Sequence, residues 1–205
     1  MGQITKGLRS ILSNPWMYAL SQELFGASKV RKHFVADFVR PRSGDHVLDI
    51  GCGPAEIIDH LPVADYWGFD ISPAYIHQAQ KKYGNAGHFF CKELTAEDLT
   101  ALPKFDIALA IGVLHHLDDR TALTLLDLAR QALKPGGRLI TLDPCFEPGQ
   151  NPLARIFISW DRGQNVRTRE GYKALVAKIF PKHQAEVRHK KGVPYTHCFM
   201  ECTQT

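Results

Sequence analysis

The sequence lacks the patterns that indicate a membrane-spanning or metal-binding protein. No apolar run approaches the ~20 residues that a membrane-spanning helix needs, so we expect no membrane span. The cysteines form neither a CxxC pair nor a Cys/His set at zinc spacing, so we expect no metal site and a reducing, cytoplasmic location. The five cysteines are Cys52, Cys91, Cys145, Cys198 and Cys202.

Strong charge of one sign is also absent. The chain has 25 basic and 21 acidic residues, and its basic residues are scattered apart from short clusters at 162–169 and 188–191. A dedicated nucleic-acid-binding protein usually has a stronger basic footprint, so we expect no nucleic-acid partner. Residues 1–22 contain two basic groups and no acid. That pattern fits a transit peptide, a membrane-surface helix or an ordinary flanking helix.

Length and apolar content favour one self-sufficient domain. A chain of 205 residues with 44% apolar residues can bury roughly 70% of the surface that its unfolded form exposes. Between Asp45 and Asp143, predicted strands alternate with predicted helices, which indicates a parallel sheet with right-handed crossovers. Two later strands, near 185–189 and 195–201, are joined by a short connection and therefore form an antiparallel hairpin.

Apolar spacing and capping residues predict where the helices lie. Val30, Phe34 and Phe38 are spaced by four residues, which predicts a helix that ends before Pro41. Ser72 is a typical N-cap, and it is followed by a helix that stops at Gly84. Further helices are expected at about 119–133, 153–160 and 172–179, and a strand at 88–91.

The most informative stretch is a short apolar run followed by two glycines. Val47 to Ile50 predicts a buried strand, and Gly51 and Gly53 then predict a tight turn. Pro54 suits the first position of a helix that runs to Leu61. A strand, a glycine turn and a helix N-terminus together form a cradle for a nucleotide cofactor.

Carboxylates in this cradle indicate which cofactor it takes. Asp49 ends the strand and Glu56 lies in the first predicted helical turn, so a pyrophosphate would be repelled. The ammonium and sulfonium of S-adenosylmethionine would be attracted, because charge-assisted hydrogen bonds are the stronger ones. Asp70 ends the next short strand, where an acid accepts from a ribose diol.

The segment 47–56 resembles motif I of class I S-adenosylmethionine-dependent methyltransferases. Three more blocks follow at that family's spacing, at 70–73, 105–117 and 133–140, so the resemblance covers residues 45–143. Small bacterial methyltransferases related to the quinone-biosynthesis C-methyltransferases are the most similar group. The resemblance implies a three-layer, doubly wound, Rossmann-like sheet of seven strands, mostly parallel, with only the last strand antiparallel.

The resemblance also implies how one domain spanning residues 1–205 is divided. Residues 1–44 would form helices over the active site, 45–143 the cofactor-binding core, and 144–205 a substrate lid and the C-terminal hairpin. Glu93 stands where the family usually has Asp, whereas Leu94 would pack on the adenine. The implied cofactor-binding residues are Asp49, Gly51, Cys52, Gly53, Asp70, Ile71, Glu93, Leu94, Ile111 and Gly112.

Two neighbouring histidines are the candidate catalytic residues. His115 and His116 follow the fourth predicted strand, at the edge where open α/β sheets bind their ligands, and imidazole titrates near neutral pH. One of them could therefore act as a general base. The same His-His-Leu run occurs in family members with different reactions, so a structural role or a cofactor contact is the alternative.

Candidate substrate-binding residues lie outside the core. Tyr18 belongs to an aromatic stretch that either lines the acceptor pocket or packs on the sheet, and His197 enters the last strand. Arg162 and Arg167 lie in the expected lid, and guanidinium groups bind carboxylates or phosphates in two-pronged pairs. They either bind an acidic acceptor or belong to a solvated loop whose arginines pair with Asp161 and Glu170.

These features predict an enzyme that transfers a methyl group from S-adenosylmethionine to a small, possibly acidic molecule in the cytoplasm. One alternative is an RNA or protein methyltransferase. The other is a non-catalytic scaffold protein that binds S-adenosylmethionine. The acceptor, the atom that is methylated and the oligomeric state stay open.

Overall fold

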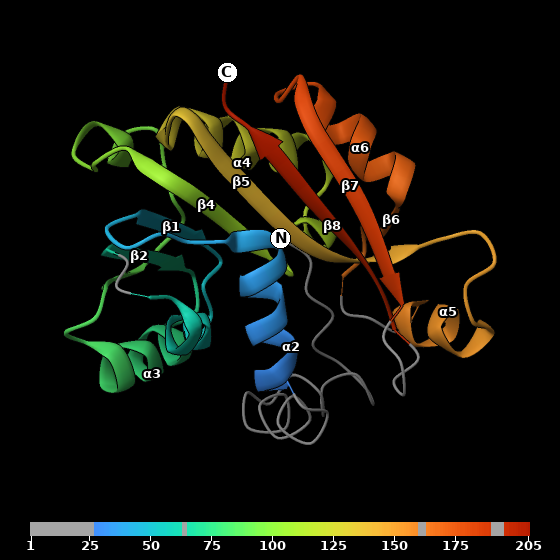
Figure 1. Cartoon of the computed structure of the whole chain (residues 1–205), viewed down its shortest axis with the longest axis horizontal. Helices are drawn as coiled ribbons and strands as arrows, with labels where there is room; N and C mark the ends of the chain where they lie inside the picture. The colour runs from blue at the N-terminus through green and yellow to red at the C-terminus, as the bar shows by residue number, and fades with distance from the viewer. Residues whose placement is uncertain (1–26, 63–64, 160–162, 190–194) are drawn as a thin grey trace.

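The fold is built around one twisted sheet (Figure 1). The computed structural model describes residues 27–62, 65–159, 163–189 and 195–205, with the side chains of 27–30 excepted. The strands are β1 (His46–Ile50), β2 (Asp65–Asp70), β3 (His88–Cys91), β4 (Phe105–Ile111), β5 (Leu133–Phe146), β6 (Arg167–Thr168), β7 (Lys182–His189) and β8 (Thr196–Thr203).

The strand order confirms the predicted topology. The order is β3-β2-β1-β4-β5-β8-β7, and β1 to β5 run parallel to one another. β8 is antiparallel to both of its neighbours, β5 and β7, so only the last strand of the sheet is reversed. The two-residue strand β6, which was not expected, pairs with the end of β5.

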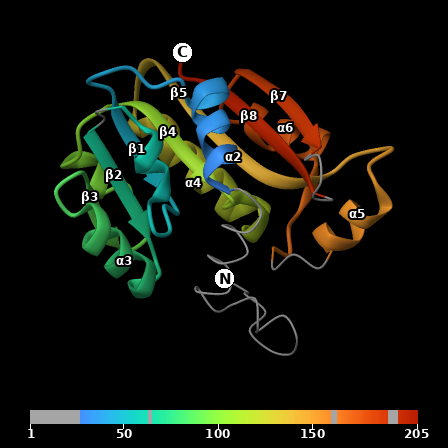
Figure 2. The same cartoon turned by 60° about the horizontal axis from the view of Figure 1, so that its bottom comes forward.

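Helices cover both faces of the sheet (Figure 2). They are α2 (Ala27–Phe34), α3 (Pro73–Tyr83), α4 (Asp119–Ala132), α5 (Pro152–Ser159) and α6 (Arg169–Ala177), and shorter turns η2 (Val35–Val39), η3 (Glu56–His60), η4 (Asp98–Thr100) and η5 (Leu114–His116). No helix in these described ranges is long and apolar enough to cross a membrane.

The core consists of two apolar clusters, one on each face of the sheet. Successive residues of a strand point to opposite faces, so Val47 belongs to one cluster and Leu48 to the other. The first cluster also contains residues of α2, η2 and α3, and the second contains residues of α4 and α6. The alternation therefore explains why both faces of these parallel strands are apolar and covered.

Local capping sets the helix boundaries as expected. Ser72 Oγ accepts a hydrogen bond from the Tyr75 N–H at 3.4 Å at the start of α3, which ends before Gly84. Asp118 caps α4 in the same way through the Thr121 N–H at 2.8 Å. The expected helix at 153–160 is found as α5, and its last expected residue lies outside the described ranges.

The prediction of a helix beginning at Pro54 is wrong. Gly51, Gly53 and Ala55 all have positive φ angles, of 77°, 54° and 58°, so the chain cannot be helical until Glu56. Only the short 3₁₀-helix η3 follows, and the Glu56 carboxylate forms an ion pair with Arg31 of α2. Glu56 is therefore paired with a residue of α2 and does not present an unpaired carboxylate to the cofactor site.

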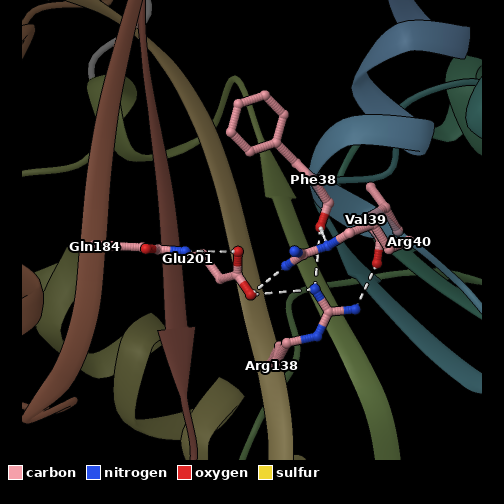
Figure 3. Close-up of polar contacts among 6 residues, drawn as sticks. All are labelled: Phe38, Val39, Arg40, Arg138, Gln184 and Glu201. Atoms are coloured by element: carbon pink, nitrogen blue, oxygen red, sulfur yellow. Dashed lines mark hydrogen bonds and ion pairs between the residues drawn. The ribbon is translucent and has the colours of Figure 1, made fainter.

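The helix expected through Val30, Phe34 and Phe38 ends before Pro41, as predicted, but its last turn is a π-helix. α2 changes into the π-helix η2, which stops before Pro41 because Arg40 adopts a left-handed conformation with φ 46°. Arg138 of β5 donates hydrogen bonds to the carbonyl oxygens of Phe38 and Val39, at 3.1 and 2.6 Å (Figure 3). Glu201 of β8 pairs with both Arg40 and Arg138. These charged groups satisfy the last carbonyls of the helix and fix its end on the sheet.

Candidate functional site

The candidate cofactor site lies where the carboxyl ends of β1, β2 and β4 meet. The N–H groups of Gly51 and Cys52 donate to the carbonyl oxygen of Phe69, at 2.7 and 3.0 Å. The Asp70 carboxylate accepts from the Gly53 N–H at 2.9 Å and from the Ser72 N–H at 2.8 Å. Asp70 therefore joins the glycine turn to the start of α3, with its carboxylate fixed at the end of β2.

A side chain at Gly51 would displace the loop that follows β4. A Cβ atom at Gly51 would lie 2.6 Å from Cγ2 of Val113, which follows β4, and its φ of 77° already disfavours a side chain. At the end of β4, Gly112 also has a positive φ, of 69°, and its N–H donates to the Leu142 carbonyl oxygen at 2.7 Å. Both glycines allow the backbones after β1 and β4 to approach one another closely.

Asp49 is the only acid of the cradle that is fully buried among the residues described. The Tyr66 hydroxyl donates to Asp49 Oδ2 at 2.6 Å, whereas Oδ1 has no hydrogen-bond partner in the described part of the chain. Burial raises the pKa of Asp49 to about 7, against the lowering effect of the Tyr66 hydrogen bond and together with the nearby Asp70. A buried, unpartnered carboxylate oxygen is costly, and a bound ammonium would satisfy it.

The other predicted cofactor-binding side chains divide into exposed and buried ones. Leu94 is only 7% exposed and packs in the core, whereas Ile71, next to Asp70, is 54% exposed. Ile71 therefore offers an apolar surface to a ligand, and Leu94 offers little. Glu93 is exposed and Ile111 is half-buried.

A buried His–Asp pair lies at the same edge of the sheet. His115, in the turn η5, has its ring Nδ1 2.8 Å from Asp143 Oδ1, and its backbone N–H donates to the same oxygen at 3.1 Å. Asp143 belongs to β5 and is 1% exposed. The contact favours the tautomer with the proton on Nδ1, which makes Nε2 the basic nitrogen of the ring.

Sequence reasoning missed Asp143. It stands in an Asp-Pro-Cys-Phe run at the end of the fifth strand, where no candidate residue was expected. The available signal was the topology itself, since β4 and β5 are neighbours and their carboxyl ends lie together. The ring of His116 lies 4.0 Å from that of His115.

Arg167 holds the loop that carries His115. Its Nη1 donates to the carbonyl oxygen of Leu114 at 2.9 Å, its Nη2 to that of Leu117 at 2.9 Å, and it pairs with Asp119 through Nε and Nη2. The second hydrogen of Nη1 is used by the Asn165 carbonyl oxygen. All five N–H groups thus have acceptors within the chain, so the geometry favours a structural role over the predicted contact with an acidic acceptor.

Of the remaining substrate candidates, His197 is described by the structure, and it does not lie with the His–Asp pair. Tyr18 and Arg162 lie outside the described residues. His197 pairs in register with Pro144, and its ring lies 4.9 Å from that of Tyr195. Because Cys198 is the register partner of Asp143, the side chain of His197 points to the other face of the sheet.

Two observations limit where else a ligand would bind. The described residues contain no group of three or more metal-ligating side chains. A hollow of about 440 Å³ lies at the opposite edge of the sheet, and Tyr66 lines it, whereas Asp49, Asp70 and His115 do not. It is lined by residues such as Leu61, Asp65 and His88.

The family model and the two relatives described here are all methyltransferases. Residues 48–139 match a family model described as "Methyltransferase domain". The chain is 35% identical over 155 residues to the O-methyltransferase cnsE of Penicillium expansum, over 66% of this chain and 54% of that protein. It is 31% identical over 180 residues to an O-methyltransferase of Pyrenophora dematioidea, over 78% of this chain and 67% of that protein. The chain spans about half the length of the first curated relatives that it matches, or less.

A solved structure shares the fold. The plantazolicin methyltransferase BpumL, in complex with a triazolic desmethylPZN analog and SAH, superposes with a TM-score of 0.62 at 15% identity. The match covers 96% of this chain and 94% of that one. At this identity the likeness concerns the fold alone.

Proposed function

Because this chain belongs to the class I S-adenosylmethionine-dependent methyltransferase family, we propose that it transfers a methyl group to a hydroxyl oxygen of a small molecule. The His115–Asp143 pair is the observation that carries this proposal. A hydroxyl acceptor must lose its proton when it is methylated, and an imidazole held by a carboxylate is suited to take that proton. The curated relatives named as O-methyltransferases support the same choice of atom.

The pair has the geometry of a base and its orienting group. Asp143 holds Nδ1 of His115 and is itself 1% exposed, so the ring is fixed in one orientation and one tautomer. Asp143 would also stabilise the imidazolium that forms when Nε2 accepts the proton. Arg167 acts one step further away, because it fixes the carbonyl groups on either side of the histidines.

The residues of the glycine turn fit the cofactor of this family. Asp49 Oδ1 would accept from the ammonium of the methionine end, and Asp70 would accept from the ribose hydroxyls. Ile71 would pack on the adenine. When bound, S-adenosylmethionine supplies a methyl group that its sulfonium has already activated.

The proposed methyl acceptor is a small molecule. We assign residues 45–143 to cofactor binding and 144–205 to the acceptor side. Binding of an acidic substrate would depend on Arg162, because the N–H groups of Arg167 already donate to oxygens of the chain. A cytoplasmic location would fit the pattern of free cysteines.

The test is methyl transfer from radiolabelled S-adenosylmethionine to a panel of small phenols and catechols. His115→Asn should lower the transfer rate by roughly 100-fold or more, because a positioned base contributes that much. His77→Asn, on the exposed face of α3, is the matched control and should match the wild type. Unchanged rates in His115→Asn would contradict the assigned base, and transfer only to nitrogen, carbon or sulfur acceptors would contradict the proposed hydroxyl.

A further inference from the structure

Tyr66 contacts Asp49, the buried carboxylate of the cofactor site. It lies in β2, is 1% exposed, and its hydroxyl donates to Asp49 Oδ2 at 2.6 Å. The partner carboxylate is 2% exposed and keeps Oδ1 without a hydrogen-bond partner among the described residues. One oxygen of the carboxylate is therefore held by the protein and the other is left for a ligand.

The chain makes room for this contact at Gly68. Residues 66 and 68 point to the same face of β2, and Gly68 is the register partner of Asp49. A Cβ atom at Gly68 would lie 3.0 Å from Cε1 of Tyr66 and 2.8 Å from Sγ of Cys52. The phenol ring can extend over position 68 to the carboxylate only because that position has no side chain.

The other groups around Asp49 disfavour its charge. Cys52 and Asp70 face it from the turn and from the end of β2, and neither is a cation. None of the ion pairs described includes Asp49. The Tyr66 hydroxyl is therefore the group that favours the ionised carboxylate, while burial and Asp70 oppose it.

We propose that Tyr66 is a positioning residue for the cofactor: its hydroxyl holds Asp49 Oδ2 and leaves Oδ1 to accept from the ammonium, whose binding requires Asp49 to release its proton. This inference rests on the proposed function only through the identity of the cofactor. A neutral Asp49 carboxyl gives its proton to solvent, and the carboxylate that remains pairs with the incoming ammonium. Because the pKa of Asp49 is about 7, that exchange falls within the physiological pH range.

The proposal gives a defined pH dependence for wild-type protein. If only the ionised carboxylate binds, affinity should rise about tenfold between pH 6 and pH 8. At pH 7 about half a proton should be released for each ligand bound. Both values can be measured by calorimetric titration with S-adenosylhomocysteine, which has the same ammonium, in buffers of different ionisation enthalpy.

Tyr66→Phe separates positioning from a merely structural role. Without the hydroxyl, the pKa of Asp49 should rise by about one further unit, because hydrogen bonds to a charged group stabilise it by that order. The variant should then bind about tenfold more weakly than wild type at pH 6, but only about twofold more weakly at pH 8. Tyr83→Phe removes a hydroxyl from the same core cluster and is the matched control.

Three outcomes would overturn parts of this account in different ways. A loss of affinity in Tyr66→Phe that is equal at every pH would show a structural role only. Wild-type binding without proton release would overturn the coupling even if the variant fails to fold. Absence of binding by folded wild type at any pH would overturn the proposed function as well.

Discussion

Replacing Asp49 by Asn should stabilise the protein without its cofactor while it weakens cofactor binding. The wild-type carboxylate is buried, has one oxygen without a partner in the described residues, and lies near Asp70. Asn keeps the size and can still accept from Tyr66 at 2.6 Å. The substitution therefore removes a buried charge and places an amide group where the unpartnered oxygen lay.

The magnitude follows from the pKa of Asp49, which is about 7 in the folded chain and ordinarily 3.8. The folded state holds the proton more tightly, so the wild type loses stability as pH rises from about 4 to about 7. At about 1.4 kcal/mol for each pKa unit, the full loss is about 4 kcal/mol, of which about 2–3 kcal/mol falls between pH 5 and pH 8. The unpaired Asn amide costs about 1–3 kcal/mol at every pH.

Urea unfolding followed by tryptophan fluorescence checks this prediction. The difference in unfolding free energy between Asp49→Asn and wild type should move in favour of the variant by about 2–3 kcal/mol from pH 5 to pH 8. Other ionisable groups are common to both proteins and cancel in the difference. A difference that does not change with pH would refute the assignment of a raised pKa to Asp49.

Two further predictions concern the arginines. Arg138→Met should lower the free energy of unfolding by about 2 kcal/mol in urea unfolding, because the carbonyl oxygens of Phe38 and Val39 lose a charged donor. Arg130→Met is the control, because its partner Asp127 lies on the same helix, and it should change the free energy of unfolding by less than about 0.5 kcal/mol. Equal effects of the two substitutions would contradict the anchoring role of Arg138. Arg167→Met should slow methyl transfer by roughly tenfold or more with cofactor affinity unchanged, because it loosens the loop around His115. Arg169→Met is the control and should leave the rate of methyl transfer unchanged. Equal rates in the two variants would contradict the structural role of Arg167.

The sequence was sufficient for the elements that local chemistry decides. The apolar run at Val47 to Ile50 and the cap at Ser72 specify a strand and a helix from neighbouring residues alone, and both are found. The helix expected at Pro54 failed because the positive φ angles of three alternate residues, Gly51, Gly53 and Ala55, are set by the fit of the turn against the ends of β2 and β4. No local pattern reports that fit.

The site was only partly predictable, because its key contacts join distant parts of the chain. Asp143 and His115 are 28 positions apart, and Tyr66 and Asp49 are 17 apart. Arg167 illustrates the opposite error, since an arginine in a polar loop looks available in sequence and is fully engaged in the fold. Residue type and position near strand ends indicated where the site lies, and only packing showed which side chains pair.

The central claim is that the glycine turn binds S-adenosylmethionine. Calorimetric titration of wild-type protein with S-adenosylmethionine and, separately, with NAD tests it most directly. We expect saturable binding of S-adenosylmethionine and none of NAD, because Asp49 and Asp70 attract an ammonium and a ribose diol and repel a pyrophosphate. Binding of NAD, or of neither compound by folded protein, would contradict the account.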